Sequence, residues 1–144
     1  MMLACFMLGL PGGGMLVIGV AFVSVWQSLS PSDFQAWFAS HSHLIGRLMI
    51  PLGTGSIVVA VAALVASWCD PARRLWSLMA TLTAVGVTVT YPRFFAGTNE
   101  AFMRGGLSDT SVRSLLDRWA TWHWFRTGLG IVGFIAALRA LQRS

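Results

Sequence analysis

The segment LMIPLGTGSIVVAVAALVASW, residues 48–68, decides the fold class of this chain. It contains no charged residue, and it is long enough to cross the hydrocarbon core of a bilayer, which needs a helix of about 20 predominantly apolar residues. Further apolar runs occupy residues 1–27, 75–92 and 119–138. The sequence therefore predicts an integral membrane protein with four spanning helices.

The composition supports the same class. Hydrophobic residues make up 56% of the chain, charged residues only 10%, and the mean hydropathy is +0.69. A soluble domain carries far more charge on its surface. The net charge of +5 comes from ten basic residues, all arginine, which mostly flank the apolar runs, where arginine anchors helix ends and sets topology. We therefore expect membrane lipids as partners, and no nucleic acid.

The connections between the runs predict an antiparallel bundle. A tight turn at residues 69–74 joins the second and third runs, whereas longer connections at about 28–44 and 93–118 lie on the opposite face. We expect an all-α single domain over residues 1–144, an integral membrane antiparallel four-helix bundle with short interfacial helices in its two long loops. One such helix is predicted at residues 33–38, begun by a Ser/Asp cap. The expected spans are about 3–27, 46–68, 75–95 and 119–140.

The arginines also suggest an orientation. Four of them lie on the side of the short turn and the termini: Arg73, Arg74, Arg139 and Arg143. Because cytoplasmic loops are rich in arginine and lysine, this favours cytoplasmic termini, in a bacterial inner (plasma) membrane. The second long loop also carries arginines, so the opposite orientation stays open. The sequence also leaves open whether the protein forms a homo-oligomer.

The segment WATWHWFRTGLG, residues 119–130, brings polar groups to membrane depth. Only residues 127–138 separate Arg126 from Arg139, a helical rise of about 18 Å against a hydrocarbon core about 30 Å thick. His123 and Arg126 must therefore lie at or inside the membrane boundary. A charge at that depth costs about 2.5–3.5 kcal/mol on insertion scales unless it finds partners or water. This location indicates a functional site.

Polar residues from three helices are expected to meet at the same end. Trp119, His123 and Arg126 follow helical +4 and +3 spacing and share one face. The second helix contributes His43 and Arg47, and the third contributes Tyr91, Asn99 and Glu100. Each also has a simpler interpretation: the arginines can bind headgroups, Tyr91 can anchor the interface, and Glu100 can cap a helix or pair with an arginine. The convergence favours a shared pocket.

The three histidines raise a metal hypothesis. Imidazoles at His41, His43 and His123 would suit copper, iron or zinc, and a haem between His43 and His123 is a further version. His41 and His43 are two residues apart, however, and point in nearly opposite directions on a helix. Both can bind one ion only if that stretch is extended or irregular.

Short motifs along the chain resemble a known family. They are Leu48-Met49-Ile50-Pro51, Tyr91-Pro92, Thr98-Asn99-Glu100-Ala101-Phe102, Arg118-Trp119 and Arg126-Thr127. Together they resemble the anthrone-oxygenase-like family of small four-helix membrane proteins. The resemblance implies oxidation of a polycyclic anthrone to an anthraquinone by molecular oxygen, without an obvious bound redox cofactor. It maps Asn99, Trp119 and Arg126 onto recurrent positions, whereas His123 stands where an asparagine is expected.

These observations predict a membrane-embedded oxidoreductase acting on a lipophilic aromatic or quinone-like small molecule. We expect His123 as a base, since an ordinary imidazole pKa is near 6.5, with Arg126 and Asn99 completing the catalytic set. The expected substrate-binding residues are Tyr91, Trp119, Arg47, His43 and Glu100. Two alternatives are a metal- or haem-dependent membrane redox protein that uses the histidines, and a non-enzymatic membrane helper subunit.

Overall fold

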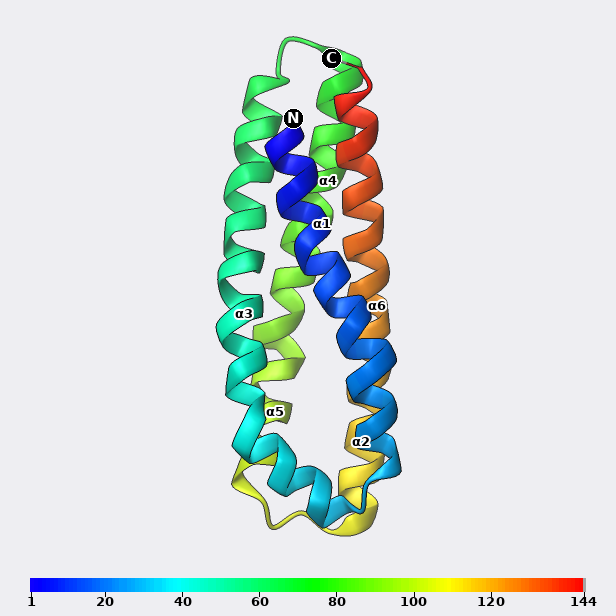
Figure 1. The fold of residues 1–144 in the computed structure, drawn as a ribbon. Helices are drawn as coiled ribbons and strands as arrows, with labels where there is room; N and C mark the ends of the chain where they lie inside the picture. The colour runs from blue at the N-terminus through cyan, green and yellow to red at the C-terminus, as the bar shows by residue number, and fades with distance from the viewer. Residues whose placement is uncertain (144) are drawn as a thin grey trace.

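The computed structural model describes residues 1–143, which form a bundle of four long helical segments (Figure 1). The segments are Met2–Ser28, Pro31–Ala66, Pro71–Arg104 and Asp109–Leu141, and each is long and apolar enough to cross a membrane. Successive segments run in opposite directions, and the described residues contain no strand. The predicted all-α antiparallel bundle is confirmed.

Two of the four segments contain a stretch of π-helix. The first consists of α1 (Met2–Val17), η1 (Ile18–Val23) and α2 (Ser24–Ser28), and the third consists of α4 (Pro71–Thr90), η2 (Tyr91–Phe95) and α5 (Ala96–Arg104). The second and fourth are the single helices α3 (Pro31–Ala66) and α6 (Asp109–Leu141). A π-helical stretch changes the backbone hydrogen-bond pattern of a helix and is frequent at functional sites.

The two long connections are mostly helical and continuous with the spans. Residues 33–38 are helical as expected, but they form the first turns of α3 instead of a separate helix, and the Ser30 hydroxyl accepts from the Asp33 N–H at 3.2 Å. These turns run obliquely across the lower end of the bundle (Figure 1). In the second connection α5 ends at Gly105 and Gly106, whose φ angles of 72° and 77° favour glycine.

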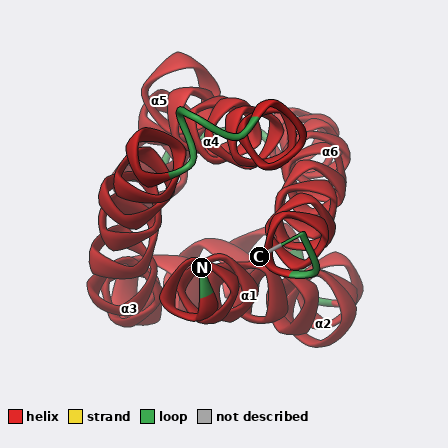
Figure 2. Ribbon diagram, turned by 90° about the horizontal axis from the view of Figure 1, so that it is seen from above, coloured by secondary structure: helices red, strands yellow, loops and turns green. Residues whose placement is uncertain are grey.

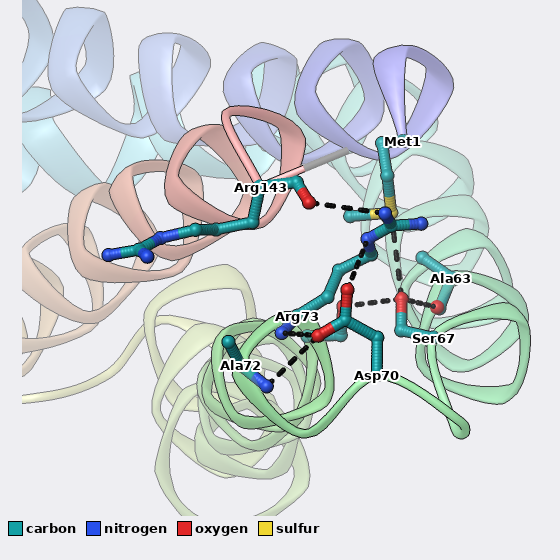
Figure 3. Close-up of polar contacts among 8 residues, drawn as sticks. Met1, Ala63, Ser67, Asp70, Ala72, Arg73 and Arg143 are labelled. Carbon is teal, nitrogen blue, oxygen red and sulfur yellow. Dashed lines mark hydrogen bonds and ion pairs between the residues drawn. The ribbon is translucent and has the colours of Figure 1, made fainter.

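The upper end of the bundle holds both termini and the short turn (Figure 1). Asp70 caps α4, because its Oδ1 accepts from the N–H groups of Ala72 and Arg73, each at 3.1 Å (Figure 3). The Arg73 guanidinium then donates to the Arg143 carbonyl at 3.1 Å. This contact ties the turn between the second and third segments to the end of the fourth.

Glycine and proline in α1 let its neighbours approach closely. A Cβ added at Gly12 would lie 3.8 Å from the backbone of Gly130, so α1 and α6 meet almost backbone to backbone. Pro11 has no N–H for the Met7 carbonyl four residues earlier, and the Ser56 hydroxyl of α3 donates to that carbonyl instead. Figure 2, viewed from above, shows the four segments around a common axis.

Candidate functional site

A cavity of about 730 Å³ lies among the helices. This volume is within the roughly 300–1,000 Å³ that is typical of small-molecule sites. Its walls come from all four segments and include both π-helical stretches, through Ile18 and Tyr91. Six of the predicted site residues line it: His43, Arg47, Tyr91, Asn99, Trp119 and Arg126. The structure thus brings most of the predicted polar set together.

Side chains that line the cavity from α3 and from η2–α5 are also exposed on the outside of the bundle, and we infer that the cavity opens sideways between these elements. Ile50, Tyr91 and Met103 line it and are also 57%, 43% and 46% exposed on the outside of the bundle. Nearer the termini, α3 and α4 meet where Thr81 Oγ1 lies 3.2 Å from the Ala60 carbonyl oxygen. At the other end Phe102 packs on α3. In a bilayer the opening between these contacts would face lipid.

Packed aromatic rings close the lower end of the cavity. Trp26 of α2 is fully buried, and its ring centroid lies 5.6 Å from Phe38 and 5.4 Å from Trp119. Phe38 also packs against Phe102 of α5, at 5.4 Å between centroids. These edge-to-face contacts join four helices. They give the polar residues above them a rigid base.

Trp119 links the polar residues into a chain across the site. Its indole N–H donates to Asn99 Oδ1 at 2.8 Å, which joins α6 to α5. Its ring also stacks on the imidazole of His123, with centroids 4.9 Å apart and an interplanar angle of 9°. The His123 Nε2 in turn lies 2.8 Å from the Met15 carbonyl of α1. Three separate segments are therefore held by one indole–imidazole pair.

The hydrogen bonds of His123 assign its tautomer. A carbonyl oxygen only accepts, so Nε2 must carry the hydrogen and donate to Met15. Nδ1 is then the acceptor, and it receives Arg126 Nη2 at 3.0 Å and Nε at 3.3 Å. His123 is 0% exposed and does not line the cavity. Contrary to the expected base role, its position suits holding Arg126 in place rather than accepting a substrate proton.

Arg126 presents an uncompensated positive charge to the cavity. Its guanidinium carbon lies 3.8 Å from the Phe95 ring centroid, a cation–π contact, and its Nη1 makes no hydrogen bond within residues 1–143. No carboxylate of the described residues lies within salt-bridge distance of it. A partly buried guanidinium with free donors is suited to an anionic or strongly polar oxygen. Sequence reasoning missed Phe95 and Met15, whose roles carry no motif.

The remaining predicted residues divide into two groups. His43 and Arg47 line the cavity from α3 and make no hydrogen bond or ion pair within the described part of the chain. Glu100 does not line it; its carboxylate pairs with Arg104 at 2.5 Å on the exposed face of α5. Such an exposed pair contributes little to stability. The structure does not bring Glu100 to the substrate-binding residues.

The three histidines do not meet. His41 is exposed, stacks on Trp37 at 5.0 Å and places Nδ1 3.0 Å from the Trp37 carbonyl. Both ring nitrogens of His123 are occupied by Met15 and Arg126. Within residues 1–143, no group of three or more histidine, cysteine, aspartate or glutamate side chains is placed to hold a metal ion. The residues present do not fit the metal or haem site considered from the sequence.

Comparisons with known proteins identify a family for this chain. The profile of a family described as "Anthrone oxygenase" matches residues 34–136, a range that contains every predicted site residue. Comparisons with curated proteins and with solved structures gave no match. The match covers well over half of the chain and includes most of α3, the whole third segment and most of α6. The chain therefore belongs to the anthrone oxygenase family.

Proposed function

We propose that the protein is a membrane-embedded oxygenase that converts a planar, lipophilic aromatic ketone of the anthrone type into a quinone. Membership of the anthrone oxygenase family supports the reaction class. The observation that carries the proposal is Arg126, an uncompensated cation on the wall of a mostly apolar cavity. A mostly apolar wall with two charged donors, the partly buried Arg126 and the exposed Arg47, suits a flat aromatic molecule that has few polar oxygens.

The proposed reaction uses dioxygen as the only oxidant. The substrate carbon opposite the ketone loses one proton, and the electron pair of the C–H bond enters the ring system as an enolate. The enolate adds dioxygen at that carbon and forms a C–O bond, giving a peroxide. Loss of the second hydrogen and cleavage of the O–O bond leave a new carbonyl and release one molecule of water. The carbon is oxidised by four electrons, and dioxygen is reduced by four.

Arg126 is placed to stabilise the enolate oxygen. A donor aimed at developing charge in a water-poor site is worth far more than the same donor in water, and it costs no reorganisation during the reaction. His123 holds the guanidinium through Nδ1, and Phe95 covers one of its faces. Asn99 and Trp119, already joined at 2.8 Å, form the adjacent wall, against which the rings can pack.

The sideways opening explains how such a substrate would arrive. A polycyclic aromatic molecule partitions into the bilayer, and the gap between α3 and η2–α5 faces the surface that lipid would cover. Ile50 and Met103 present apolar side chains at this gap. The substrate can therefore pass from lipid into the cavity without first crossing water.

The test is turnover by the purified protein in lipid nanodiscs. We expect anthrone to be converted to anthraquinone, followed by absorbance, with one dioxygen consumed per quinone formed. Arg126→Gln should lower kcat/KM by about 10²–10³, the loss typical of removing one oxyanion donor. Arg104→Gln, which removes only an exposed pair on α5, is the matched control and should stay near wild type. Turnover by Arg126→Gln equal to that of Arg104→Gln would contradict the role of Arg126.

We also propose the expected orientation, with the short turn and both termini in the cytoplasm of a bacterial inner membrane. It is supported by Arg73 and Arg143, which meet at that end. Cys69 is exposed in the turn and Cys5 is buried, so Cys69 reports the side. A membrane-impermeant maleimide should label inverted vesicles and not intact spheroplasts; the reverse pattern would place the termini outside.

A further inference from the structure

The cavity contains few groups that can take a proton. Its titratable lining residues are His43 and Arg47 from α3, Tyr91 from η2 and Arg126 from α6, with no carboxylate among them. A guanidinium group donates hydrogen bonds and has no acceptor, and a phenol is rarely a general base. Imidazole is the usual general base among these side-chain types, so His43 is the candidate base on the cavity wall.

His43 is also unoccupied, in contrast to His123. Neither of its ring nitrogens makes a hydrogen bond within residues 1–143, so the base is not already engaged by the protein. His123 uses Nε2 on the Met15 carbonyl and Nδ1 on Arg126. The two imidazoles therefore differ in what they can do: one is locked behind Arg126, and the other lies on the cavity wall.

We propose that His43 is the catalytic base that removes the substrate proton, and that His123 is a positioning residue for Arg126. This assignment rests on the proposed oxygenase function. A nitrogen of His43 takes the proton from the substrate carbon, and the electrons of the broken C–H bond move to the ketone oxygen beside Arg126. The imidazolium returns its proton to the outer peroxide oxygen, which restores the neutral base. When the O–O bond breaks, that oxygen leaves as hydroxide and takes the second hydrogen of the carbon as a proton, which gives water and the new carbonyl.

Arg126 and His43 reach the cavity from different helices, α6 and α3. A substrate bound between these helices can contact the cation with its ketone oxygen and the base with its reacting carbon. General base catalysis by a positioned group typically contributes about 10²–10⁴ in rate. The arrangement separates charge stabilisation from proton removal, so the two roles can be tested by separate variants.

The experiment compares His43→Ala with His41→Ala in nanodiscs, using anthrone and dioxygen. His41 is two residues earlier and is exposed like His43, but it does not line the cavity, so its variant is a matched control. We expect kcat to fall at least 100-fold in His43→Ala only, with added imidazole restoring part of it. Anthraquinone binding, followed by tryptophan fluorescence, should be unchanged, because His43 makes no hydrogen bond that supports the fold.

A deuterium label on the reacting carbon gives the second readout. His43→Ala should show a larger primary isotope effect on kcat than wild type, because proton removal then limits turnover. If wild type turns over anthrone and His43→Ala equals His41→Ala, the base assignment is overturned and the oxygenase function stands. If His43→Ala loses product binding and is not rescued by imidazole, its role is structural and the assignment also fails. If wild type gives no quinone, the oxygenase function itself fails, and the base assignment fails with it.

Discussion

Replacing His123 with phenylalanine isolates the contacts of the buried imidazole. Phenylalanine keeps an aromatic ring of similar size to stack on Trp119, where the centroids are 4.9 Å apart. It removes the donor to the Met15 carbonyl and the acceptor for Arg126. The variant therefore tests the hydrogen bonds that join α6 to α1 and orient the guanidinium, with packing largely preserved.

The expected loss of stability is about 2–3 kcal/mol. An unpartnered buried carbonyl costs about 1–3 kcal/mol, and a hydrogen bond to a charged group contributes about 1.5–3 kcal/mol in soluble proteins. Polar contacts between membrane helices are weaker, averaging about 0.6 kcal/mol with a maximum near 1.7. His123 is fully buried, so each of its two contacts, with Met15 and with Arg126, should lie in the upper part of the range for membrane helices. Together they give about 2–3 kcal/mol.

The assay is reversible unfolding in bicelles with increasing dodecyl sulfate, followed by circular dichroism. The control is His41→Phe, since His41 also stacks on a tryptophan and contacts a backbone carbonyl but is exposed. We expect the control to change the free energy of unfolding by less than about 0.5 kcal/mol, as exposed substitutions usually do. A His123→Phe value within 0.5 kcal/mol of the control would show that the imidazole does not hold α1 and Arg126.

Three other predictions concern helix packing and use the same assay. Gly12→Leu should destabilise the bundle by about 1–3 kcal/mol, because the side chain meets the backbone of α6, whereas Gly13→Leu, with nothing within 4 Å, should be near neutral. Ser56→Ala should lower the free energy of unfolding by about 1 kcal/mol, because it removes the donor to the Met7 carbonyl, which Pro11 cannot bond. Thr54→Ala should lower it less, because the Thr54 hydroxyl bonds only a carbonyl of its own helix. Trp119→Phe should lower the free energy of unfolding by a similar amount, because the hydrogen bond from the indole N–H to Asn99 of α5 is lost. It should also lower turnover, measured with anthrone in nanodiscs. A loss of stability in Gly13→Leu as large as in Gly12→Leu would contradict the close approach of α1 and α6. A loss in Thr54→Ala as large as in Ser56→Ala would contradict the contact between α3 and α1.

The general architecture follows from the sequence because lipid imposes a simple rule. Backbone groups in hydrocarbon must bond within their own segment, so a long apolar run such as residues 48–68 has to be helical. The short turn at Asp70 follows from a capping residue before a proline, and the structure has that cap. The helix ends were harder to place: residues 33–38 were expected to form a separate interfacial helix, and they form the first turns of α3 instead.

The candidate site residues were chosen from the sequence because they are unusual for their depth. Arg126 and Trp119 were found because a cation and an indole at helical spacing are conspicuous inside an apolar run, and both line the cavity. The roles of the histidines were not predictable in this way. His43 and His123 each have an arginine three or four residues later in the chain, and their surroundings in the bundle distinguish them.

The sequence by itself determined that this chain is a bundle of four apolar helices with polar groups near one end, because hydrophobicity and helical periodicity act locally along the chain. The tertiary structure decided which of those groups face a cavity. The Met15 carbonyl, three residues before the π-helical stretch η1, meets His123 where Gly12 lets α6 approach α1 closely. That contact turns one imidazole into a support for Arg126 and leaves His43 on the cavity wall. Such a distinction depends on contacts between distant segments, which no local pattern records.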